Sequence, residues 1–223
     1  MRFERRIRGE HAVRLITALL ATLLVLCAPQ ALSAPEGSAS SLIQVTSDRI
    51  LAEIKARRDE FKANDTELQR FVRDEMNKVL DQGYTARLVL GLHSRKASPE
   101  QIDAFGKALS DNLNRRYAKA LLEIDGNTKV EVLGETALRG GKIIRAKTNV
   151  IRSSGAPVKV DYLFRDVNNE WRAFDLIVEG ISYVQTFRSQ FDPLIRDKGL
   201  DQVTQDLQEG RIEVDTETHD SGN

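Results

Sequence analysis

The chain contains one cysteine, Cys27, among its 223 residues, and this cysteine lies in an N-terminal apolar run. No disulfide can form within a chain that has a single cysteine, so stability has to come from an ordinary hydrophobic core. Histidine is almost as scarce, because His93 and His219 are the two histidines beyond that run and they lie far apart in the sequence. We therefore expect no metal site and no cofactor.

Catalytic signatures are also missing. The glycine pair in "RGG", residues 139–141, is typical of a hairpin turn rather than of a phosphate-binding loop at a helix start. No serine stands in a nucleophile elbow, and no histidine is placed to serve as the base of a triad. We assign no catalytic residue and expect that the chain is not an enzyme.

One enzymatic alternative stays open, a small-molecule enzyme on a cone-shaped α+β fold that uses Asp175 and Glu179. These carboxylates are four residues apart on the same side of a predicted strand, beside apolar residues. A carboxylate buried there could have a raised pKa and act as a base. The simpler interpretation is that each carboxylate binds a nearby backbone N–H or an arginine such as Arg188.

An excess of positive charge is absent as well. The 33 basic residues balance the 33 acidic ones, and residues 1–34 contain five arginines and two glutamates, so the rest of the chain has a formal charge of −3. Such a chain has no basic field that could hold nucleic acid or an anionic membrane surface.

The N-terminus has the pattern of a secretory signal peptide. Arginines precede the apolar run at residues 15–28, and the small residues "ALSA" follow at 31–34. The run is too short for a comfortable membrane span. We predict a signal peptide over 1–34 that is removed, a linker over 35–46, one domain over 47–208 and a disordered tail over 209–223. Export without cysteines is typical of the bacterial periplasm.

Helices are predicted on both sides of a β-rich region. Apolar residues recur at helical spacing after Ser47, after Asn64, after Gly180 and in "LDQVTQDLQ", residues 200–208. The clearest helix runs over 98–124 and begins at "SPEQ", where Ser98 suits the N-cap and Gln101 the reciprocal position of a capping box.

Between these helices the apolar period changes to two. Four β-rich segments, 128–138, 142–152, 156–165 and 170–179, are separated by the turn sequences "RGG", "SSG" and "VNNE". Short connections favour an antiparallel meander. The predicted fold class is α+β, a four-stranded antiparallel sheet curled against several helices.

Several segments together resemble one known family. "SPEQIDAFGKALSDNLNRRYAKAL", "KVEVLGE", "VKVDYLF", "EWRAFDLIVEGISYVQTFRSQF" and "KGLDQVTQDL" are similar, in order, to the MlaC-type periplasmic phospholipid-binding proteins of the Mla pathway, also called toluene-tolerance proteins. The resemblance covers about residues 47–208. It implies a sheet and helices that enclose a deep apolar lipid cavity, with phospholipid as cargo rather than as cofactor.

The resemblance also implies a function and partners. A carrier of this kind shuttles phospholipids between outer and inner membranes and maintains outer-membrane lipid asymmetry. Its partners would be an outer-membrane lipoprotein–porin complex and an inner-membrane ABC transporter with a lipid-binding ring, and we expect a monomer that binds no nucleic acid. A periplasmic protein-binding adaptor, with its apolar surface exposed, is the second alternative. The residues expected to line the cavity are Tyr117, Val132, Val150, Tyr162, Phe164, Phe174, Leu176, Val178, Ile181, Val184 and Phe187.

Overall fold

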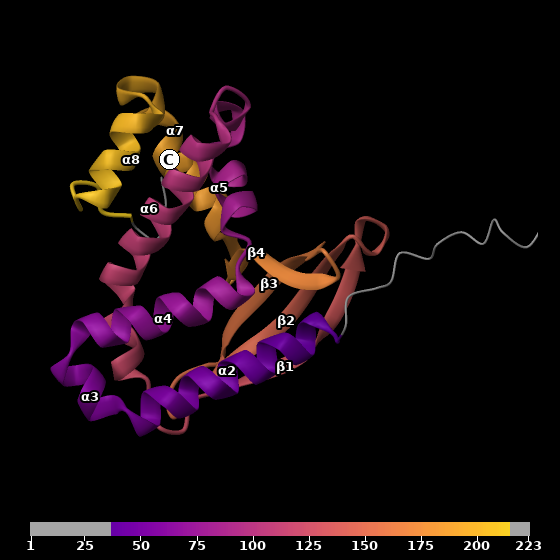
Figure 1. Ribbon diagram of the computed structural model, residues 1–223. Helices are drawn as coiled ribbons and strands as arrows, with labels where there is room; N and C mark the ends of the chain where they lie inside the picture. The colour runs from indigo at the N-terminus through magenta and orange to yellow at the C-terminus, as the bar shows by residue number, and fades with distance from the viewer. Residues whose placement is uncertain (1–36, 215–223) are drawn as a thin grey trace, which may run out of the picture. The chain divides into compact units, whose positions relative to one another are not determined.

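The computed structural model describes residues 37–214 of the chain (Figure 1). The predicted signal peptide and residues 215–223 of the predicted tail lie outside this range. Within the described residues, no helix has both the length and the apolar content needed to cross a membrane.

The sheet is an antiparallel meander, as predicted, with its strands in the order of the sequence. Its strands are β1 Lys129–Leu138, β2 Ile143–Ile151, β3 Val158–Val167, β4 Glu170–Val178 and β5 Ile181–Ser182. The predicted number of four is one too few. Glu179 and Gly180 both have positive φ angles, 48° and 88°, and turn the chain so tightly that Ile181 pairs with Val178 as a short fifth strand.

Helices make up the rest of this mixed α+β fold. They are α2 Ala39–Ala56, α3 Arg58–Ala63, α4 Asp65–Val79, α5 Gln82–Leu90, α6 Pro99–Tyr117, α7 Tyr183–Lys198 and α8 Leu200–Gln208, with the 3₁₀ turns η1 Gly91–Arg95, η2 Ala118–Glu123 and η3 Arg139–Gly141. The predicted capping box is present: Gln101 N–H donates to Ser98 Oγ, and Ser98 N–H donates to Gln101 Oε1.

The linker predicted over 35–46 is wrong from Ala39 onward, where α2 begins. Ser38 caps the helix by accepting from Ser41 N–H, and Glu135 on β1 accepts from Ser40 N–H at 3.0 Å. The small polar residues at this helix start carry little helical signal. Tertiary contacts rather than helix propensity stabilise this helix start, because the first turns of α2 pack on the sheet.

The disordered tail predicted from residue 209 is also wrong over its described part. Residues 209–214, here called the C-terminal segment, pack against α6. Asn112 Nδ2 donates to Ile212 O at 2.9 Å, Tyr117 Oη donates to Val214 O at 3.2 Å, and the Val214 side chain is fully buried. The polar composition of the segment suggested disorder, but its backbone carbonyls are bound by side chains far away in the sequence.

Three groups of buried apolar residues form the core. One joins α5, α6, α7 and α8, the second joins α2 to β2, β3 and β4, and the third joins α2, α3, α4 and η2. In Figure 1, α2 runs along the sheet while α5 to α8 gather at one end of it. The space where these three groups meet is not filled by side chains, and it contains the candidate site.

Candidate functional site

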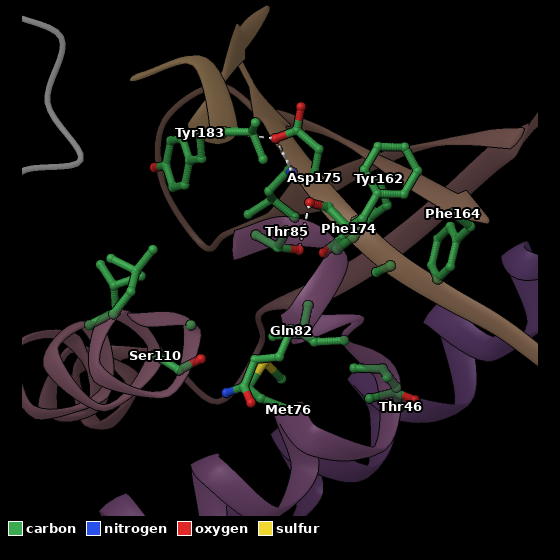
Figure 2. Close-up of a pocket in the computed structure, with 18 of the residues that line it drawn as sticks. Thr46, Met76, Gln82, Thr85, Ser110, Tyr162, Phe164, Phe174, Asp175 and Tyr183 are labelled. Atoms are coloured by element: carbon green, nitrogen blue, oxygen red, sulfur yellow. Dashed lines mark hydrogen bonds between the residues drawn. The ribbon is translucent and has the colours of Figure 1, made fainter. Parts of the chain in front are cut away.

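Two adjoining pockets lie where the helices meet the sheet. The first, here called the sheet chamber, has a volume of about 380 Å³. β3 and β4 form one wall of it, and α2, α4, α5, α6 and α7 form the others (Figure 2). Its sheet wall consists of Tyr162, Phe164, Ala173, Phe174, Asp175 and Leu176.

The second pocket, here called the helix chamber, has a volume of about 500 Å³ and is enclosed mainly by α4, α6 and η2. Eight residues line both chambers, so the two form one continuous hollow. This shared wall consists of Ile50, Met76, Leu80, Ser110, Leu113, Leu176, Tyr183 and Phe187. Six of these eight side chains are apolar, which makes the hollow suitable for hydrocarbon.

A β-bulge in β4 shapes the sheet wall. Phe164 pairs with Ala173 and Leu163 pairs with Asp175, so Phe174 has no partner of its own across the strands. The extra residue reverses the alternation of β4 at this point. Ala173 and Leu176 are three residues apart and would face opposite ways in a regular strand, yet both line the sheet chamber.

Seven of the eleven residues predicted to line a cavity do line one of the chambers. Tyr162, Phe164, Phe174 and Val184 line the sheet chamber, Tyr117 lines the helix chamber, and Leu176 and Phe187 line both.

The other four predicted residues line neither chamber. Val132, Val150 and Val178 are half-buried and lie in rows of the sheet on the side of Tyr162 that points away from Phe164. Ile181 is 39% exposed, because the tight turn before it places it on the short edge strand β5. The sheet wall of the chamber extends from the Tyr162–Leu176 pair toward Phe164 and Ala173, so these four residues lie outside it.

Sequence reasoning missed most of the helical wall. Ile50, Leu80, Leu109 and Leu113 all belong to apolar stripes that the sequence displays, and these stripes predicted helices without indicating which helices face a hollow. Met76 and Tyr183 carried no signal of their own. The polar wall residues Gln82 and Ser110 were missed because single polar positions within a helix are common.

Asp175 holds the backbone of the strand-to-helix connection. Its Oδ2 accepts from Ser182 Oγ at 2.6 Å, and its Oδ1 accepts from the N–H of Val184 at 3.1 Å, in the first turn of α7. Figure 2 shows the carboxylate turned toward this connection. An anionic group at a helix N-terminus is favourable because unpaired N–H groups point at it, so the carboxylate is occupied as a cap.

Glu179 is likewise occupied by backbone. Its Oε1 accepts from Lys159 N–H at 2.6 Å, while its own N–H donates to Lys159 O at 2.9 Å. Glu179 is exposed and lines neither chamber. Both carboxylates therefore bind nearby backbone N–H groups, as the simpler interpretation of the sequence proposed. Arg188 is not their partner.

Tyr162 is a titratable side chain in the sheet wall. Burial raises the pKa of its phenol above the ordinary value, so the ring stays neutral at neutral pH. The ring keeps some accessible surface because it faces the chamber. A neutral ring at this position preserves the apolar character of the wall.

The helix chamber reaches the surface along α4. Arg73 and Asn77 line it and are exposed, whereas the other described residues in the walls of both chambers are buried or half-buried. Arg73 Nε donates to Asp111 Oδ1 at 3.1 Å across the α4–α6 contact. A ligand with a polar end could place that end at this edge.

Metal-ligating side chains do not gather in the part of the chain that the structure describes, since no three His, Cys, Asp or Glu residues lie close enough to hold an ion. His93 Nε2 instead makes a 2.9 Å hydrogen bond with Asp192 Oδ1, between η1 and α7.

Comparisons with known proteins agree with this architecture. Residues 44–209 match the family model described as MlaC protein. The chain is 25% identical to the "Intermembrane phospholipid transport system binding protein MlaC" of Haemophilus influenzae, over 78% of this chain and 82% of that protein. It is 28% identical to the "Toluene tolerance protein ttg2D" of Pseudomonas putida, over 80% of this chain and 83% of that protein.

A solved structure is similar over the same region. The phospholipid-binding protein of Ralstonia solanacearum, determined in complex with a phospholipid, superposes with a TM-score of 0.69 at 25% identity. The match covers 78% of this chain and 96% of that protein. Because the family model spans most of the sequence and the fold agrees, this chain belongs to the MlaC protein family.

Proposed function

We propose that this chain is a periplasmic carrier that binds the acyl chains of phospholipids in the sheet and helix chambers and shuttles phospholipids between the outer and inner membranes. The observation that carries the proposal is the continuous hollow, about 380 and 500 Å³ in its two parts, with a mainly apolar shared wall. Chambers of this size fall in the range of ligand sites, roughly 300–1,000 Å³.

The physical need for such a hollow follows from the hydrophobic effect. A two-chain phospholipid carries on the order of 30 methylenes, and each costs about 0.8 kcal/mol in water. Unassisted crossing of an aqueous compartment would therefore cost about 24 kcal/mol, which is prohibitive. A protein whose interior resembles the bilayer removes that cost and needs no covalent chemistry, since loading and unloading are nearly balanced.

The comparisons support the same cargo. The relative from Ralstonia solanacearum was solved with a phospholipid, and the relative from Haemophilus influenzae is named as a phospholipid transport component. The outer-membrane lipoprotein–porin complex, the inner-membrane ABC transporter and the maintenance of lipid asymmetry belong to this proposal through the family resemblance, as do the periplasmic location and the monomeric state.

The enzymatic alternative has less support, because Asp175 and Glu179 both accept hydrogen bonds from the backbone. The adaptor alternative requires a broad exposed apolar surface. The large apolar side chains that the structure exposes are scattered over α2, η1, β1 and β5, while the main apolar surface is enclosed. We therefore propose a binding protein without catalytic activity.

Organic extraction of the protein purified from a periplasmic fraction, followed by mass spectrometry, tests the proposal. Diacyl phospholipid in near-stoichiometric amount is the expected result. Delipidated protein should then take up phospholipid from vesicles and transfer it to acceptor vesicles at a rate that rises with protein concentration. Protein that is purified empty and takes up no lipid from vesicles would overturn the proposal.

A further inference from the structure

The wall of the sheet chamber contains the polar side chains Thr46 and Ser47 on α2, and others on the packed helices α5 and α6. Ser110 on α6 lines both chambers, and Gln82 on α5 lines the sheet chamber. Figure 2 shows both side chains extending into the pocket from the helical side, across from Tyr162 on the sheet.

The packing of α5 on α6 brings these two residues together. A Cβ atom placed on Gly106 would lie 3.1 Å from Ala86 Cβ and 3.3 Å from the backbone oxygen of Gln82, so the helices touch at this glycine. Ser110 is four residues after Gly106 and therefore lies on the same face of α6. The amide of Gln82 and the hydroxyl of Ser110 thus belong to one small region of the wall.

Neither polar group is used by the fold. Among the described residues, the structure gives the side chains of Gln82 and Ser110 no hydrogen-bond partner. In contrast, Thr85 Oγ1 donates to Phe174 O at 2.9 Å, and the Asp175 carboxylate caps α7. If hydrocarbon covered Gln82 and Ser110, both side chains would lose their hydrogen bonds to water and gain no others, which is unfavourable. The amide NH2 of Gln82 and the hydroxyl of Ser110 can donate to hydrogen-bond acceptors on the part of a ligand that lies here.

A diacyl phospholipid has such acceptors at one point. Its two ester carbonyl oxygens lie where the acyl chains diverge, next to the phosphate. The chambers also diverge from one shared wall, and the exposed Arg73 and Asn77 lead from the helix chamber to solvent. We infer that Gln82 and Ser110 donate hydrogen bonds to the ester carbonyls of the lipid and so fix the depth of its glycerol backbone, with the head group emerging beside Arg73. This inference rests on the proposed function.

The test compares two lipids that differ in the ester carbonyls. Delipidated protein is incubated with vesicles containing equal amounts of a diester phosphatidylglycerol and its diether analogue with the same chain lengths, and the bound lipids are quantified by mass spectrometry. The two lipids partition differently between vesicle and protein for reasons unrelated to the site. The informative quantity is therefore the change in the bound diester-to-diether ratio between wild type and variants, because the vesicle contribution cancels.

We expect Gln82→Leu and Ser110→Ala each to lower this ratio about two- to tenfold, the effect of one net hydrogen bond. Ser110→Thr keeps the hydroxyl and should keep the ratio. Ser189→Ala on the exposed side of α7 is the matched control, and Gln82→Met replaces Gln82→Leu if the latter does not fold. An unchanged ratio in folded Gln82 and Ser110 variants would overturn the inference while the carrier function stands. Failure of wild type to bind either lipid would overturn both.

Discussion

The carboxylate of Asp175 joins β4 to α7, which are separated by the tight turn at Glu179 and Gly180 and by the two-residue strand β5. It accepts from Ser182 Oγ and from Val184 N–H, so the strand holds the helix N-terminus at a fixed position. Val184 and Phe187 extend from this helix into the chambers. One polar side chain of the sheet wall thereby positions two apolar side chains of the chambers.

Replacing Asp175 with Asn should leave the lipid bound and lower the stability of the fold. The amide retains one acceptor oxygen but loses the charge that favours the helix N-terminus, so we expect a loss of about 0.5–2 kcal/mol. Thermal unfolding and lipid content are measured on the same preparation. A variant that folds as well as wild type but is purified without lipid would contradict the structural role.

Ile181 and Val184 form a matched pair for testing which side chains face the hollow. Ile181 is 39% exposed on β5, whereas Val184 is 6% exposed and lines the sheet chamber. Ile181→Asp should therefore fold and retain its lipid, because its carboxylate stays in water. Val184→Asp places a carboxylate against acyl chains, which should expel the lipid or lower the unfolding temperature by several degrees. If the two variants had the same lipid content and the same unfolding temperature, Val184 would not face the acyl chains.

Among the elements, the strands and most helices could be predicted because their apolar periods are regular. The face on which each strand residue lies was harder to predict, since the bulge at Phe174 depends on how β3 and β4 pair. Counting alternate residues puts Ala173 opposite Phe174, and the structure places both in the same wall. A local insertion in a ladder leaves no mark in the sequence of one strand.

The beginning of α2 and the C-terminal segment show a second limit of sequence patterns. Both have small or polar residues, and both are ordered by partners about a hundred residues away: Glu135 for α2, Asn112 and Tyr117 for the segment. The candidate site shares this property. Seven predicted residues line the hollow, but the fact that the space between the stripes stays open depends on how far apart the helices are held.

The C-terminal segment is anchored by Asp206 on α8, which is 4% exposed. Gln202, Arg211 and Lys198 all donate to its carboxylate, and these hydrogen bonds lower its pKa from 3.8 to about 2. Because the folded pKa lies below the ordinary value, the carboxylate contributes stability that is fully present above about pH 4 and is lost as the pH falls toward 2.

Asp206→Asn should therefore unfold at a lower temperature than wild type at neutral pH, and the difference should narrow as the pH is lowered from 4 to 2. Thermal unfolding followed by circular dichroism across this range measures the effect. Asp197→Asn, on the exposed side of α7, serves as the control for loss of one negative charge. A difference that stays constant with pH would show that the ion pairs do not hold the segment.

At the scale of the whole molecule, the hollow is a packing defect that the fold tolerates. Three apolar groups of residues surround it, and none of them fills it. An unfilled interior lacks the dispersion contacts of a close-packed core, so the empty protein gives up stability that cargo restores.

Filling the shared wall should separate binding from stability. Leu113 on α6 lines both chambers and is half-buried. Leu113→Trp adds bulk where the chambers join, so we expect lipid content to fall at least tenfold while the unfolding temperature of the lipid-free protein stays equal or rises. Leu92→Trp, at an exposed position on η1, is the control. A Leu113 variant that keeps its full lipid content would show that cargo does not occupy the junction.

The shared wall also contains a natural spectroscopic reporter. The chain has two methionines; Met1 lies in the segment predicted to be removed, and Met76 lines both chambers. Isotopic labelling of methionine methyl groups would then give the processed protein a single NMR resonance, located beside the cargo. Its chemical shift and linewidth would distinguish loaded from lipid-free molecules during transfer, without any engineered probe and at the point where the two chambers meet.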